Sequence, residues 1–143
     1  MTVKLALEGK IRDKSVKEFI KEYEKRLSPW FKLETAELED SRKYFDKLNK
    51  QNNAFEIVAA LDAKGRKFTS EKFADWFEEK RSLSKNITFV IGEASGLSEA
   101  ARKAAVEYIS LSDMTLSYRV SLMVMAEQIY RAMTIIAKHP YHK

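Results

Sequence analysis

The sequence predicts an α/β domain built on a mainly parallel sheet with helices on both faces. Short apolar runs alternate with longer segments of helical periodicity along the whole chain, which is typical of strands joined by crossover helices. One apolar run, residues 55–62, is nearly continuous, as expected for a strand that is buried on both faces. The chain contains no internal repeat, low-complexity segment or linker, so we expect residues 1–143 to form one domain.

The first half of the chain predicts two strands and two helices. Its first strand alternates apolar and polar side chains and is followed by Gly9, a turn residue. Apolar residues then recur every three or four positions from Asp13 until Ser28 and Pro29 stop the helix. The predicted elements are a strand at residues 3–7, a helix at 13–27, a strand at 31–38 and a helix at 40–52.

The second half predicts three strands and three helices. After the strand at residues 55–62, the basic residues 64–67 are expected to form a loop. Thr69 or Ser70 can then cap a helix, and Glu71 is favourable in its first turn. The remaining predicted elements are a helix ending before residue 82, a strand at 87–91, a helix at 98–107, a strand at 108–110 and a helix at 120–137.

Three segments of this half are candidates for a binding site. In open parallel sheets, ligands bind beyond the carboxyl ends of the strands. Residues 62–68, 92–98 and 111–116 each follow an apolar strand. We therefore expect these three segments to converge on one site.

The last predicted helix is apolar almost all round. Such a helix in a globular domain must be covered on both sides. One side can lie on the sheet, but a domain of this size offers little material to cover the other, so the pattern predicts a homodimer. The alternative is a helix that is fully buried in the core of its own chain.

Composition excludes several classes of protein. The chain has no cysteine, so it has neither disulfides nor thiolate chemistry, and its two histidines are not a metal-ligand set. Its four glycines form neither a phosphate-binding G-x-x-x-x-G-K-S/T loop nor a G-x-G-x-x-G dinucleotide fingerprint. The net charge of +5 is mild and dispersed, which permits nucleic-acid binding without arguing strongly for it. Without a long apolar stretch or a signal-peptide pattern, we expect a soluble cytoplasmic protein.

Four motifs follow one another in the second half of the chain. They are Phe89-Val90-Ile91-Gly92-x-x-x-Gly96-Leu97-Ser98, Leu111-Ser112-x-Met114-Thr115-Leu116, Glu127-Gln128-Ile129-Tyr130-Arg131-Ala132 and His139-Pro140-Tyr141-His142-Lys143. In this order they resemble the RlmH (YbeA) family of SPOUT-class methyltransferases, which act on large-subunit ribosomal RNA. The resemblance covers essentially the whole chain.

The resemblance implies a C-terminal trefoil knot, a homodimer and S-adenosyl-L-methionine as the methyl donor. It also implies methylation at N3 of a pseudouridine in helix 69 of 23S rRNA on the assembled ribosome, with no DNA, membrane or metal partner. Carried onto this sequence, the cofactor contacts are Leu61, Gly92, Leu111, Ser112, Asp113, Met114, Thr115 and Leu116.

The resemblance also suggests roles for the C-terminal residues. We expect His142 to act as the base that removes the imide proton, because histidine titrates near ~6.5, although contact with RNA alone is an alternative. Tyr141 would orient or stack on the target base, and Arg131 would contact phosphate or the developing charge. The expected RNA contacts are Lys143, Arg119 and His139.

Two departures from the family pattern keep a second function open. Glu93 and Ala94 stand where the family loop usually continues with glycine and proline, and Ser117 and Tyr118 stand where it usually has Pro-His. The alternative function is a non-catalytic ribosome-binding or assembly factor that retains the knotted fold.

Overall fold

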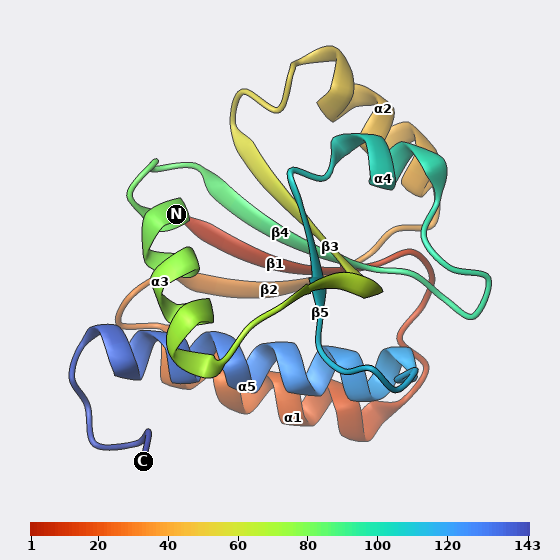
Figure 1. The fold of residues 1–143 in the computed structure, drawn as a ribbon. Coiled ribbons are helices and arrows are strands. Elements are labelled where there is room, and N and C mark those ends of the chain that lie inside the picture. Colours follow the sequence, from red (N-terminus) through yellow and green to blue (C-terminus); the bar gives the residue numbers. More distant parts are fainter.

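Five strands form one sheet in which every neighbouring pair runs parallel, in the order β2-β1-β4-β3-β5 (Figure 1). The structure is a computed structural model and describes residues 1–143. The strands are β1 (Thr2–Leu7), β2 (Lys32–Glu37), β3 (Glu56–Lys67), β4 (Asn86–Ile91) and β5 (Glu107–Ser110). The helices are α1 (Lys14–Leu27), α2 (Ser41–Lys50), α3 (Ser70–Arg81), α4 (Glu99–Ala104) and α5 (Tyr118–Ile136).

Helices cover both faces of the sheet, which confirms the predicted α/β architecture. Figure 1 shows α1, α3 and α5 on one face and α2 with α4 on the other. Successive residues of a strand point to opposite faces, so Phe89 of β4 packs in the larger core and Val90 in the smaller one. The central strands are therefore buried on both sides, which explains their nearly continuous apolar runs.

The sheet differs from the prediction beside β5. The predicted loop at residues 64–67 is wrong, because β3 continues to Lys67 and pairs with β5 along this extension. The pairing breaks after Leu61 and resumes at Arg66, so the residues between them bulge out of register. A Cβ atom on Gly65 would lie 2.6 Å from the carbonyl carbon of Tyr108, so this close approach requires glycine.

Other elements of the same chain cover more of α5 than the sequence predicted. It lies against the sheet between α1 and α3 (Figure 1), and Met125 near its middle is only 1% exposed. Val120 remains exposed near its first turn. None of the helices combines the length and apolarity that a membrane crossing requires.

The end of α5 reverses the direction of the chain. Lys138 has a φ of 57°, the Lys138 N–H donates to the carbonyl of Ile135 at 3.2 Å, and the His139 N–H donates to the carbonyl of Thr134 at 2.8 Å. These two bonds form a Schellman motif, which usually has glycine at the position of Lys138. The last residues consequently turn back along α5.

The core around Phe89 provides a test of the fold. Phe89 is fully buried, and its ring lies 6.0–6.5 Å from those of Phe73, Trp76 and Phe77. We expect Phe89→Ala to lower the free energy of unfolding by about 3–5 kcal/mol, because it leaves a cavity among these rings. Phe55→Ala is the matched control, since Phe55 is 74% exposed, and it should change stability by no more than about 0.5 kcal/mol. Urea unfolding followed by circular dichroism measures both, and equal effects would contradict this account of the core.

Candidate functional site

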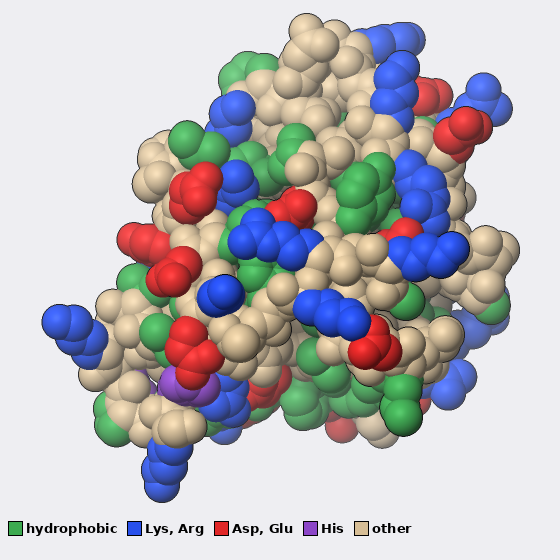
Figure 2. Space-filling view, viewed as in Figure 1, with side chains coloured by type: hydrophobic (Ala, Val, Ile, Leu, Met, Phe, Trp, Pro, Cys, Tyr) green, Lys and Arg blue, Asp and Glu red, His purple; other side chains and the backbone are tan.

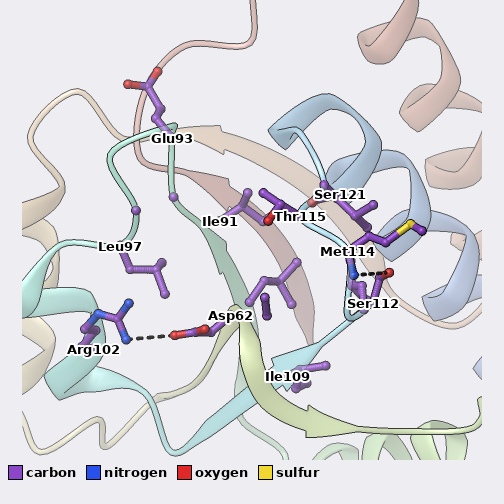
Figure 3. A pocket seen from close by; sticks show the side chains of 16 residues that line it. Asp62, Ile91, Glu93, Leu97, Arg102, Ile109, Ser112, Met114, Thr115 and Ser121 are labelled. Carbon is purple, nitrogen blue, oxygen red and sulfur yellow. Dashed lines mark hydrogen bonds and ion pairs between the residues drawn. The ribbon is translucent and has the colours of Figure 1, made fainter.

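The pairing break of β3 and the carboxyl ends of β4 and β5 surround one cavity of about 200 Å³, here called the first cavity (Figure 3). Leu61 lies at the break in β3, Gly92 follows β4 and Leu111 follows β5, and all three line the cavity. The first turn of α5 contributes Ser121. The three segments expected to converge therefore do so, because parallel strands end at the same edge of a sheet.

The loop after β4 depends on two glycines. The Gly96 N–H donates to the carbonyl of Glu93 at 2.8 Å and closes a tight turn. A Cβ atom on Gly92 would lie 2.6 Å from the carbonyl carbon of Gly96, and Gly96 itself has a φ of 87°. A side chain at either position would distort the wall of the first cavity.

The carboxylate of Glu93 lies outside the first cavity. In Figure 3 its side chain points away from the other labelled residues. It packs against Gly9, where a Cβ atom would lie 2.0 Å from Glu93 Oε1. The residue that replaces the usual glycine of the family loop therefore fills space over the β1–α1 connection.

The loop after β5 forms the opposite wall. The Ser110 hydroxyl donates to the Ser112 carbonyl at 3.0 Å, and the Met114 N–H donates to Ser112 Oγ at 3.0 Å. Ser112, Met114, Thr115 and Leu116 line the cavity, as expected for cofactor contacts. Asp113 does not line it, because its carboxylate pairs with Lys67 on the extension of β3.

An ion pair that sequence reasoning missed stands in the wall of the first cavity. The Asp62 carboxylate accepts from the Lys64 backbone N–H at 2.9 Å and from the Arg102 guanidinium at 3.0 Å (Figure 3). These two bonds hold the pKa of Asp62 below its usual value, the backbone bond having the larger effect. The signal for Asp62 was its place at a strand end, whereas no pattern in the sequence marked Arg102 of α4.

The three residues expected to be catalytic form a separate cluster at the other end of α5. The Arg131 guanidinium lies 2.9 Å from His142 Nδ1 and 2.6 Å from Glu127 Oε1. The Tyr141 hydroxyl donates to Glu127 Oε1 at 3.1 Å, and His142 Nε2 lies 2.7 Å from Glu71 Oε1. The reversal at Lys138 brings these side chains together.

Hydrogen-bond chemistry fixes the donor and acceptor roles within this cluster. A guanidinium only donates and a carboxylate only accepts, so His142 accepts at Nδ1 and donates from Nε2–H. Both ring nitrogens are therefore occupied while the tail is packed in this way. Burial, the contact with Tyr23 and the Glu127 carboxylate raise the pKa of Tyr141 to about 12, so its hydroxyl stays protonated at neutral pH.

The cluster does not line the first cavity of its own chain. α5 has 19 residues and is about 27 Å long. It begins beside the first cavity, whereas the tail returns only as far as Glu127, about 13 Å along the axis from Tyr118. Within one chain, the expected cofactor residues other than Asp113 line the first cavity. The expected catalytic residues form a separate cluster away from it.

The expected RNA contacts are also divided between the two ends of α5. Arg119 lies in the first turn, where it approaches Asp13, and His139 and Lys143 are exposed in the tail. Across the face drawn in Figure 2, Lys and Arg are interspersed with Asp and Glu, as in the Arg66–Glu107 pair. On this face the charge is therefore as dispersed as it is along the sequence.

The structure contains no group of three or more His, Asp and Glu side chains placed to hold a metal ion. Neither the sequence nor the structure therefore offers a cluster of side chains of the kind that usually binds a metal ion.

Comparison with known proteins identifies the family. The family model described as "Predicted SPOUT methyltransferase" matches residues 1–142. Proteins named "Ribosomal RNA large subunit methyltransferase H" are similar over their full length: the one from Caldicellulosiruptor bescii is 35% identical over 99% of both chains, and the one from Gemmatimonas aurantiaca is 36% identical over 100% of both.

Solved structures share the fold at low sequence identity. A probable methylase family protein from Haemophilus influenzae has a TM-score of 0.59 and 8% identity over 99% of this chain and 70% of its own. The SpoU methyltransferase AviRb from Streptomyces viridochromogenes, solved in complex with the cofactor AdoMet, has a TM-score of 0.54 and 12% identity over 96% of this chain and 58% of its own. With a family model that spans nearly every residue and full-length relatives above 30% identity, the chain belongs to the SPOUT methyltransferase family.

Proposed function

We propose that this protein transfers a methyl group from S-adenosylmethionine to N3 of a pseudouridine in helix 69 of 23S rRNA on the assembled ribosome. The observation that carries the proposal is the convergence of three strand-end segments on one cavity, in a chain whose full-length relatives are named for methylation of large-subunit rRNA. Residues 1–143 would work as a single methyltransferase domain in the cytoplasm, where ribosomes are found.

The residues of the first cavity fit S-adenosylmethionine. Ile91, Ile109 and Leu116 offer apolar walls for the adenine ring, and Gly92 lets the backbone of Gly96 pack closely against it in the cavity wall. The charged Asp62 suits the ribose hydroxyls, and Arg102 suits the carboxylate of the methionine part. When bound, S-adenosylmethionine supplies an electrophilic methyl group on a positively charged sulfur.

The chain must also hold the target base and assist removal of its N3 proton. Arg131 is suited to stabilise the negative charge that spreads over the base, because it remains charged at any pH at which the protein is folded. Tyr141 is suited to donate a hydrogen bond or to stack, since its hydroxyl stays protonated. For His142 to act as the base, its Nδ1 must first leave Arg131, since Nε2 carries the hydrogen that binds Glu71.

A homodimer would unite the two groups of residues. The tail cluster lies well along α5 from the first cavity of its own chain, so an antiparallel partner could present its tail to that cavity. Val120 and Met114 are exposed apolar residues at the cavity end of α5, and Met114 is 78% exposed. We include the trefoil knot of this family in the proposal, formed by the segments around the first cavity.

The departures from the family pattern do not favour a non-catalytic role. Glu93 packs outward on Gly9 and leaves the first cavity open. Arg119, in the first turn of α5, offers a cation at the cavity end of this helix. No contact in the structure singles out an assembly factor over an enzyme.

The first cavity is tested by paired substitutions in one loop. Gly92→Val should weaken S-adenosylmethionine binding by about tenfold or more, because its Cβ would strike the backbone of Gly96. Ala94→Val is the matched control, since Ala94 is exposed and does not line the cavity. Titration calorimetry measures binding, and circular dichroism should be unchanged in both variants. If the two variants bind S-adenosylmethionine with equal affinity, the first cavity is not the cofactor site.

Dependence on the ribosome is a second test. The mixed surface charge gives little general attraction for RNA, so specificity must come from a surface that only the folded ribosome presents. We expect kcat/KM on ribosomes to exceed that on an isolated helix 69 oligonucleotide by at least about tenfold. Similar values for the two substrates would contradict ribosome dependence.

Mixed dimers test whether the tail works across the interface. At a cofactor concentration well below the Kd of the Gly92→Val chain, that chain and a chain lacking residues 140–143 should each have little activity alone. After equal mixing and chain exchange, half of the dimers are mixed and one site in each is intact, so about a quarter of the wild-type activity should return. Mass spectrometry of the intact dimers confirms the exchange. Zero activity after confirmed exchange would show that the tail acts on its own chain.

A further inference from the structure

The exposed side of α2 carries a row of three lysines, here called the α2 lysine row. Lys43, Lys47 and Lys50 follow one another at spacings of four and three residues, so they share one side of the helix over about 10 Å of its length. All three are exposed, and none of them forms an ion pair, whereas Arg42 of the same helix pairs with Asp46 at 3.7 Å. The row therefore presents three ammonium groups that no carboxylate of the chain neutralises.

The α2 lysine row borders an open hollow that has no apolar side chain in its lining. The residues that line it all belong to α2 and its amino-terminal cap: Asp40, Arg42, Lys43, Asp46, Lys47 and Lys50. Both acids already have partners, because the Asp40 carboxylate accepts from the Lys43 backbone N–H at 3.1 Å and Asp46 pairs with Arg42. The hollow is therefore positively charged and suits an anionic group rather than an apolar ligand.

The stability of α2 does not explain this row. Lys43 lies in the first turn, where the helix dipole disfavours a cation, and the first turn contains no acidic residue. Lys47 lies four residues after Lys43 and three before Lys50, so like charges repel one another along the row. Only Lys47 and Lys50 gain from the carbonyl end of the helix. An arrangement that benefits the helix so little indicates a partner outside the chain.

The α2 lysine row also lies on the side of the molecule that the proposed dimer leaves open. Figure 1 shows α2 and α4 on the face of the sheet opposite α5, where the partner chain would pack. Because all five strands are parallel and α2 begins just after β2, the amino end of α2 lies at the same edge of the sheet as the first cavity. A large partner that reaches the first cavity at this edge can therefore also contact the row.

From these features we propose that the α2 lysine row is a docking surface for the phosphate backbone of rRNA in the ribosome. This inference rests on the proposed function and adds a contact surface outside both the first cavity and the tail cluster. A lysine ammonium is a compact charge on a flexible stem, which binds a phosphate without reading a base. Three such contacts orient the protein on a large particle, and the binding that they give is sensitive to salt.

Removal of the three charges tests the docking surface. A variant that carries Lys43→Gln, Lys47→Gln and Lys50→Gln should bind purified ribosomes at least about tenfold more weakly at about 0.15 M salt. The slope of log K against log salt concentration should become shallower by about 2 to 3, because three phosphate contacts are lost. Glutamine keeps the helix propensity of lysine, so the Tm should stay within about 2 °C of the wild type. The Kd for S-adenosylmethionine should change by less than about twofold, since the row does not line the first cavity.

A second triple variant on α1 is the matched control. Lys14→Gln, Lys21→Gln and Lys25→Gln remove the same number of charges from three lysines that are also exposed. This control should bind ribosomes with the affinity and the salt dependence of the wild type. Equal weakening in the two variants would show that net charge alone attracts the ribosome, and normal binding by the α2 variant would exclude the row as a docking surface.

A cross-link identifies the partner and separates this inference from the proposed function. With the photoreactive residue p-benzoylphenylalanine in place of Lys47, light should join the protein to rRNA within the ribosome. Cross-links to ribosomal protein alone would overturn the assignment to RNA. If the cross-link forms on rRNA but the wild-type protein does not methylate rRNA, the proposed function alone fails. If the wild-type protein methylates rRNA and the α2 variant binds ribosomes normally, the docking surface alone fails.

Discussion

The parallel pairing of β3 with both β4 and β5 is the constraint on which the rest of the structure depends. Because the three strands run in one direction, their carboxyl ends meet at one edge, and the chain must cross over the sheet between them. The crossovers place helices on both faces and bury the strands twice, which explains the apolar runs in the sequence. The break in pairing after Leu61 lies in the wall of the first cavity, beside the Gly92 and Leu111 segments.

The features that sequence could predict are those set by local patterns. Strand ends followed by small or polar residues located Gly92 and most of residues 111–116, the family resemblance added Leu61, and the structure gathers them in one cavity. Asp113 was expected in the cavity but lies outside it, because its carboxylate pairs with Lys67. The sequence predicted a loop at Lys67, whereas this residue lies on the extension of β3. The ion pair of Arg102 with Asp62 could not be predicted, because it forms only when α4 packs near β3 in the folded chain. The reversal at Lys138 had no sequence signal, since its αL position is not a glycine.

α5 acts as a spacer between two chemically different ends. One end completes the first cavity, and the other carries the ion-paired cluster of Glu127, Arg131 and the tail. In the proposed dimer, an antiparallel partner would bring its cluster to the first cavity of the other chain. The mixed charge of the surface is consistent with recognition through shape and assembled context instead of a strong general field.

The central claim is that this fold supports methylation of one base in large-subunit rRNA. The most direct measurement is mass-spectrometric mapping of 23S rRNA from cells that lack the gene, compared with the parent cells and with cells carrying a restored copy. The account predicts that a single methyl group, on N3 of a pseudouridine in helix 69, disappears in the deletion and returns with the restored gene. An identical set of modified nucleotides in all three samples would contradict it.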